Sequence, residues 1–86
     1  MTEKEIDAEI KVTVIGVLKI PDGEYNEDLA AGDHPSWDSI GHVNLLMAVE
    51  KRFDIVFDVT DAIDIETLVD MKEMTKKYVA LKSGSV

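Results

Sequence analysis

Cysteine is absent from this 86-residue chain, and proline, aromatic residues and positive charge are all scarce. Without cysteine the chain has no disulfide, no thiol nucleophile and no thiolate metal site. Nine lysines and arginines stand against 18 acidic residues, which gives a formal charge of −9. Nucleic-acid binding needs clustered basic residues, so this charge argues against a nucleic-acid partner. It argues equally against docking on an anionic membrane surface.

Long apolar runs are missing as well. No stretch approaches membrane-spanning length and no apolar signal segment follows Met1, so we expect a cytoplasmic protein without membrane insertion. Hydrophobic residues still make up 45% of the chain, which is enough to bury a core. The length suits one small domain. We expect that domain to span residues 1–82, with 83–86 as a frayed tail and the protein as a monomer.

Hydrophobic periodicity predicts an all-α fold. Segments near both ends of the chain repeat apolar residues at spacings of three and four, as one face of a helix does. Thr2 and Glu5 fit a capping box before the first segment, and Thr67 can cap the last. A strand over Val12–Ile20 is the competing interpretation, because its β-branched residues favour strands. The expected buried faces are Ile6, Ile10, Val14, Val17 and Leu18 in the first helix, and Leu68, Met71, Met74, Tyr78 and Leu81 in the last.

The middle of the chain predicts a long loop and then a further helix. Pro21 to Trp37 contains both prolines and shows no apolar period, so it is expected to be a loop that Leu29 and Trp37 anchor. Asp38 can cap a helix that runs to about Phe53. A short turn of helix is expected between residues 58 and 64. Together these elements predict a small antiparallel bundle of three long helices plus one short helix.

The helix after Asp38 carries two separate apolar faces. Leu45, Leu46, Val49 and Phe53 form one face, and Ile40, Val43 and Met47 form the other. A small core needs only the broader face, so the second is available to a partner. Burial of both faces is the alternative.

The sequence lacks the residue patterns that most catalytic and metal sites require. His34 and His42 fit no zinc-binding spacing, and neither acidic segment has the glycine position of an EF-hand loop. Asp38, Ser39 and His42 are the residue types of a hydrolase triad. In a triad the imidazole lies between the carboxylate and the serine hydroxyl, and Asp38 and Ser39 are adjacent in the sequence, so His42 cannot take that position. We therefore expect no catalytic residues and no metal site. His42, on the core-facing side of its helix, is expected to pack or to bond the loop.

Ser39 stands at a distinctive place, because it opens a helix directly after the N-cap. Free backbone amides and the positive end of the helix dipole would stabilise a phosphate there. The alternative is an ordinary first-turn serine beside its cap. The residues alone leave both interpretations open.

Three segments together resemble the acyl carrier proteins, which bind phosphopantetheine. Trp37–Val43 looks like the Asp-Ser-Leu signature of that family, and Leu45–Phe53 is similar to its second helix. Asp64–Met71 resembles the start of its last helix. The signature tripeptide is weak alone, whereas its placement in a pattern that spans essentially the whole chain is specific.

The resemblance implies a carrier and not an enzyme. Ser39 would receive 4′-phosphopantetheine from coenzyme A through a Mg²⁺-dependent phosphopantetheinyl transferase, and the thiol of that arm would hold acyl groups as thioesters. Asp38 would cap the helix and contact the metal of the transferase complex. Ile40, Val43 and Met47 would contact partners, namely the acyl-loading and acyl-processing enzymes of fatty-acid, polyketide or related specialised biosynthesis.

The sequence also departs from the family pattern. Ile40 replaces the usual leucine, and Gly41, His42 and Asn44 stand where carriers of fatty-acid synthesis often have acids and hydroxyls. Glu50 is the only acid from residue 39 to 53. These departures favour a specialised carrier over the housekeeping one. Two other interpretations remain, an aminoacyl or D-alanyl carrier with the same serine and an unmodified helical interaction module.

Overall fold

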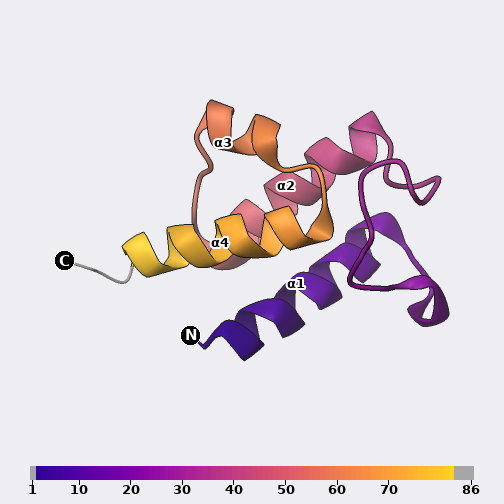
Figure 1. Ribbon diagram of the computed structural model, residues 1–86, viewed down its shortest axis with the longest axis horizontal. Helices are drawn as coiled ribbons and strands as arrows, with labels where there is room; N and C mark the ends of the chain where they lie inside the picture. Colours follow the sequence, from indigo (N-terminus) through magenta and orange to yellow (C-terminus); the bar gives the residue numbers. More distant parts are fainter. Residues whose placement is uncertain (1, 83–86) are drawn as a thin grey trace.

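The computed structural model describes residues 2–82, and the expected tail at 83–86 lies outside the described residues. Four α-helices follow one another, α1 (Glu3–Leu18), α2 (Ser39–Phe53), α3 (Val59–Asp64) and α4 (Leu68–Lys82), with a 3-10 turn η1 (Asp22–Glu24) in the loop after α1 (Figure 1). Apart from one isolated bridge between Ala30 and Thr67, residues 2–82 contain no extended pairing. The predicted all-α fold of three long helices and one short helix is confirmed.

The first helix forms as its cap and periodicity predicted. Thr2 Oγ1 accepts the Glu5 N–H at 3.1 Å, and Glu5 Oε1 accepts the Thr2 N–H at 2.7 Å, so two free donors are satisfied reciprocally. The helix ends at Lys19, whose φ of 55° places it in the left-handed region. The competing strand over Val12–Ile20 is therefore wrong. Four of the five expected core residues are buried, and Val17 is only partly buried.

The second helix separates its two apolar faces as predicted. Leu45 and Val49 are fully buried and Phe53 is 7% exposed, with Leu46 packed at the edge of the core. The opposite face points to solvent, because the exposed fractions of Ile40, Val43 and Met47 are 73%, 54% and 60%. The alternative that both faces are buried is therefore wrong.

The last two helices bring one confirmation and one correction. The short turn expected between residues 58 and 64 is α3, and a reciprocal cap joins Thr67 and Asp70 at the start of α4. Leu81, expected on the buried face of the last helix, is 68% exposed, while Thr75 is fully buried. The buried face of α4 therefore includes Thr75 and not Leu81, which periodicity alone did not distinguish.

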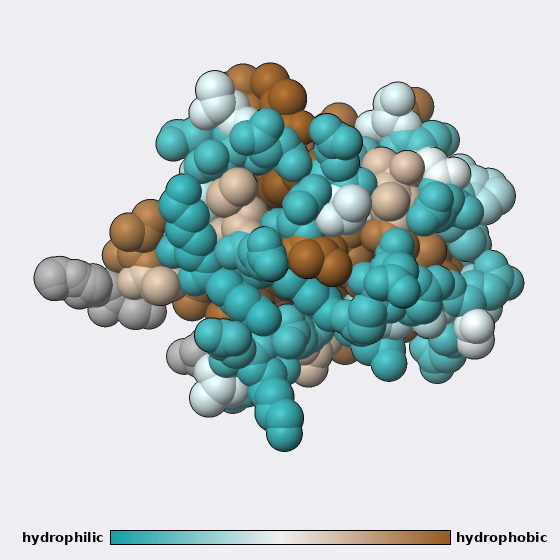
Figure 2. Space-filling view, in the orientation of Figure 1, coloured by the Kyte–Doolittle hydropathy of each residue, from teal (hydrophilic) through white to brown (hydrophobic). Residues whose placement is uncertain are grey.

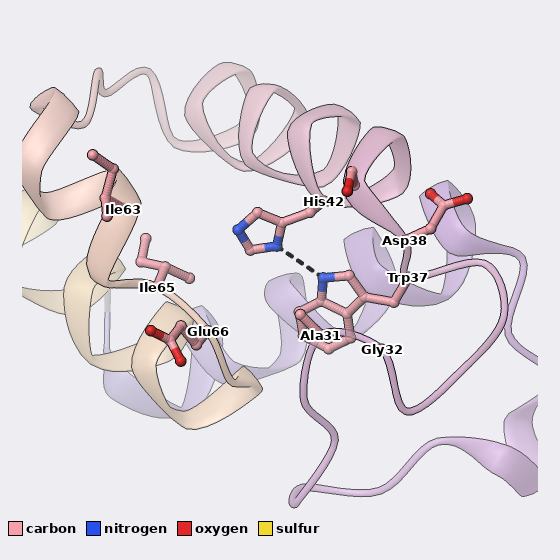
Figure 3. Close-up of a pocket in the computed structure, with 9 residues that line it drawn as sticks. Ala31, Gly32, Trp37, Asp38, His42, Ile63, Ile65 and Glu66 are labelled. Carbon is pink, nitrogen blue, oxygen red and sulfur yellow. Dashed lines mark hydrogen bonds between the residues drawn. The ribbon is translucent and has the colours of Figure 1, made fainter.

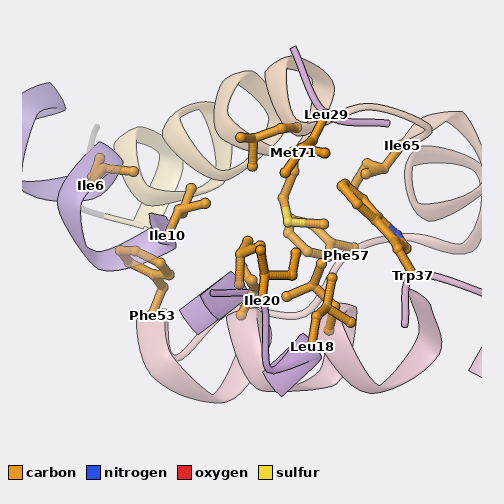
Figure 4. Packing of buried hydrophobic residues seen from close by; sticks show 14 of the residues in the cluster. Ile6, Ile10, Leu18, Ile20, Leu29, Trp37, Phe53, Phe57, Ile65 and Met71 are labelled. Carbon is orange, nitrogen blue, oxygen red and sulfur yellow. The ribbon is translucent and has the colours of Figure 1, made fainter. Parts of the chain in front are cut away.

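The long helices pack with α1 antiparallel to α2 and α4 (Figure 1). Arg52 near the end of α2 pairs with Glu9 at 2.6 Å, and Lys76 of α4 pairs with Asp7 at 3.1 Å. Lys82 joins the ends of α4 and α2 through Asp54 at 2.8 Å. Figure 4 shows the side chains of the helices and connecting segments converging on one core. Among residues 2–82 no helix combines the length and the apolar character needed to cross a membrane.

The long loop is held against α2 and the start of α4. Leu29 is buried, and its carbonyl oxygen accepts the Leu68 N–H at 2.9 Å. The Ala31 N–H donates to the Glu66 carbonyl oxygen, also at 2.9 Å. Trp37 closes the loop and is fully buried. Both predicted anchors, Leu29 and Trp37, are thus confirmed.

Alanine substitutions on the two faces of α2 should differ in how much they lower the free energy of unfolding. Phe53→Ala should lower the free energy of unfolding by about 3–5 kcal/mol, because it leaves a cavity in the core. Met47→Ala should change it by less than about 1 kcal/mol, since Met47 is largely exposed. Urea denaturation followed by circular dichroism measures both. Equal losses for the two variants would contradict this division of the helix.

Two exposed carboxylates predict how stability depends on pH. The hydrogen bond from the Thr2 N–H lowers the pKa of Glu5 from 4.5, and the hydrogen bond from Lys82 lowers the pKa of Asp54 from 3.8. As pH falls through this range, the unfolded state takes up protons before the folded state does, so folding stability decreases. The thermal midpoint should therefore fall on acidification below about pH 4.5.

The double variant Glu5→Gln, Asp54→Asn tests this assignment, because both amides keep the side-chain shape without titrating. Its thermal midpoint should fall less steeply with acid than that of the original chain. Glu73→Gln is the control, since Glu73 is exposed and its side chain makes no hydrogen bond or ion pair within residues 2–82. If Glu73→Gln reduces the pH dependence of the thermal midpoint as much as the double variant does, Glu5 and Asp54 are not its source.

Candidate functional site

Ser39 is the first residue of α2 and is exposed. Asp38 precedes it in an extended conformation and accepts the Gly41 N–H at 2.7 Å, so the predicted N-cap is confirmed. Within the described range, the N–H groups of Ser39 and Ile40 have no acceptor. The Ser39 hydroxyl therefore lies beside two free backbone donors at the positive end of a helix dipole.

A close approach of the backbone fixes the chain just before Ser39. The Ser36 carbonyl oxygen lies so near Gly41 that a β-carbon there would overlap it. A β-carbon would also meet Asp38 Oδ1 and Leu18 Cδ2, each at 3.2 Å. Gly41 is therefore required by packing of the loop on the first turn of α2. This explains why glycine stands at a position where the resembled family often has a polar side chain.

Trp37 and His42 connect the loop to α2. The Trp37 indole Nε1–H donates to His42 Nδ1 at 2.9 Å, and the two rings stack at 18° with centroids 6.1 Å apart. His42 thus bonds the loop, as predicted. The Asp38 carboxylate caps α2 and the His42 ring bonds Trp37, with no hydrogen bond between the carboxylate and the imidazole, so Asp38, Ser39 and His42 form no triad.

A cavity of about 500 Å³ opens beside Ser39. Figure 3 shows the Trp37 and His42 rings on one side of it and Ile63, Ile65 and Glu66 on the other, while the Asp38 carboxylate points away. Ala31 and Gly32 complete the lining. Sequence reasoning missed these residues of the loop and of the α3–α4 region, because helical periodicity describes one element and gives no information on which segments meet.

Helix α3 also carries exposed apolar side chains. Val59 and Ile63 are 76% and 69% exposed, and Ile63 also lines the cavity. In Figure 2 apolar atoms appear at the upper edge of the molecule beside α3, above the hydrophilic side chains that cover its front. The sequence analysis identified the stripe of Ile40, Val43 and Met47 on α2 but not these exposed apolar residues of α3.

A second polar network holds the loop itself. His34 Nδ1 lies 2.8 Å from Ser36 Oγ and accepts the Ser36 N–H at 3.2 Å, while His34 Nε2 lies 3.0 Å from Glu24 Oε1. Sequence reasoning did not connect these three residues, because Glu24 lies ten positions before His34. The network joins the start of the loop to the segment before Ser39, and so restrains the chain that leads into α2.

Neither histidine belongs to a cluster of metal ligands. Among residues 2–82, no three His, Asp or Glu side chains are placed to hold a metal ion. His34 and His42 are instead bonded to Glu24 and Trp37 respectively.

Comparison with known proteins adds no further assignment. No model of a protein family matches this chain, and no curated protein is significantly similar to it.

The close approach at Gly41 predicts an unusual response to alanine. Gly41→Ala should lower the free energy of unfolding by about 1–3 kcal/mol, because the overlap with the Ser36 backbone outweighs the better helix propensity of alanine. Gly16→Ala in α1 is the matched control, since no heavy atom lies within 4 Å of its β-carbon position. That variant should be more stable by up to about 1 kcal/mol. Urea midpoints that move in the same direction for both would contradict the packing argument.

Proposed function

We propose that this chain is an acyl carrier protein in which Ser39 bears a covalent 4′-phosphopantetheine arm. The observation that carries the proposal is an exposed serine at the start of a capped helix, beside a cavity and an exposed apolar stripe. The resemblance of Trp37–Val43 to the family signature supplies the chemical identity of the group.

The modification needs an accessible hydroxyl and an environment that accepts a phosphodiester. Ser39 Oγ would attack the phosphorus that carries pantetheine in coenzyme A, forming an O–P bond as the pyrophosphate linkage breaks. Adenosine 3′,5′-bisphosphate would leave, and a base of the transferase would take the hydroxyl proton. The free N–H groups of Ser39 and Ile40 then favour the negative charge.

The surface around Ser39 fits transient contacts with several enzymes. Ile40, Val43 and Met47 are exposed without serving the core, so they are free for a phosphopantetheinyl transferase and for acyl-loading and acyl-processing enzymes. Contiguous exposed apolar residues of this kind typically mark interaction sites. The pathway would be fatty-acid, polyketide or a related specialised biosynthesis, and the chain would work as a cytoplasmic monomer without catalysis of its own.

Incubation with coenzyme A, Mg²⁺ and a broad-specificity transferase tests the proposal. Intact mass should increase by one phosphopantetheine group, and Ser39→Ala should abolish the increase while its helical circular dichroism is kept. Ser36→Ala is the control, because Ser36 lies three residues away and is bonded to His34. A modified Ser39→Ala protein would disprove the assignment of the residue.

The same experiment separates the alternatives. An original chain that gains no mass would support an unmodified interaction module that uses the exposed stripe. An aminoacyl or D-alanyl carrier would gain the arm equally, and would differ in the thioester that its loading enzyme forms.

A further inference from the structure

The hydrogen bond between Trp37 and His42 fixes where His42 carries its proton. The indole Nε1–H can only donate, so His42 Nδ1 must accept and therefore has no hydrogen. The neutral imidazole then carries its hydrogen on Nε2. Figure 3 shows this second ring nitrogen facing the cavity toward Ile63 and Ile65. Within residues 2–82 it has no acceptor.

Glu66 supplies the complementary group at the same cavity. Its backbone is held on both sides, because its N–H lies 3.2 Å from Asp70 Oδ2 and its carbonyl oxygen accepts the Ala31 N–H at 2.9 Å. Its carboxylate has no hydrogen-bond or ion-pair partner in the described part of the chain. The cavity thus presents the His42 Nε2–H as a donor and the Glu66 carboxylate as an acceptor, beside the apolar side chains of Ile63 and Ile65.

We propose that His42 and Glu66 are positioning residues that hold an amide of the phosphopantetheine arm in this cavity. His42 Nε2–H would donate to the amide carbonyl oxygen, and the Glu66 carboxylate would accept an amide N–H. Ile63 and Ile65 would contact the apolar parts of the arm. This inference rests on the proposed function, since it concerns the group attached at Ser39.

An amide suits this lining better than an acyl chain does. Burial of a polar group is unfavourable unless it is hydrogen-bonded, so an apolar occupant that covered the half-buried His42 would leave its Nε2–H without a partner. The exposed Glu66 carboxylate likewise offers an acceptor that an apolar occupant cannot use. Phosphopantetheine contains two amides, each with one donor and one acceptor. The donor of His42 and the acceptor of Glu66 therefore match an amide of the arm better than they match the acyl chain at its end.

Nuclear magnetic resonance of the modified protein tests the inference. The ring ¹⁵N shifts of His42 should report hydrogen on Nε2, and nuclear Overhauser effects should join the protons of the arm to the methyl groups of Ile63 and Ile65. His42→Phe and Glu66→Ala should each lower the docked fraction of the arm by about two- to tenfold, as expected for loss of one hydrogen bond. His42→Gln should retain docking, because the carboxamide can accept from Trp37 and still donate to the arm.

Asp64→Ala is the matched control for Glu66→Ala, since Asp64 is an exposed carboxylate two residues away that does not line this cavity. It should leave docking unchanged. If His42→Phe does not fold, the comparison of Glu66→Ala with Asp64→Ala decides the question. An arm without contacts to Ile63, or docking equal in Glu66→Ala and the original chain, would overturn the inference while leaving the modification of Ser39 intact. Absence of any mass increase would overturn the proposed function as well.

Discussion

Burial of the Trp37 indole ties the long loop to the rest of the protein, and the geometry around Ser39 depends on it. The ring is fully buried, so its N–H must find an acceptor inside the protein, and His42 provides one. That bond joins the last residue of the loop to the first turn of α2. Because Asp38 and Ser39 lie between these two residues, the cap and the exposed hydroxyl are held from both sides.

Charged residues are distributed differently on α1, where they form ion pairs with other helices, and on the outward face of α2, which is apolar. Acidic residues of α1 are paired with bases of other helices, as Glu9 is with Arg52 and Asp7 with Lys76. Exposed pairs of this kind contribute little each, but they reduce the self-repulsion of a chain with a charge of −9. On α2 the single acid, Glu50, accepts the Phe57 N–H and so supports the turn toward α3. The outward stripe of α2 is left apolar and without acids.

The division of α2 into two faces has a physical basis in the size of the protein. A domain of this length buries only part of its apolar surface, and the fully buried residues already come from α1, α2, α4 and the connecting segments. Ile40, Val43 and Met47 can therefore stay exposed without loss of the core. The cavity lies where the loop, the start of α2 and the segment from Ile63 to Glu66 meet.

Local patterns in the sequence determined the helices, the capping residues Thr2 and Asp38, and the two faces of α2, because capping and periodicity involve residues a few positions apart. They also indicated Ser39 through its place after the cap. Tertiary structure decided the rest. The cavity combines Trp37 and His42 with Ile63 and Glu66, and the overlap that requires Gly41 comes from the Ser36 backbone. Leu81 matched the helical period but is exposed. Such contacts depend on how separate segments pack in space, which the spacing of residues along one helix does not specify.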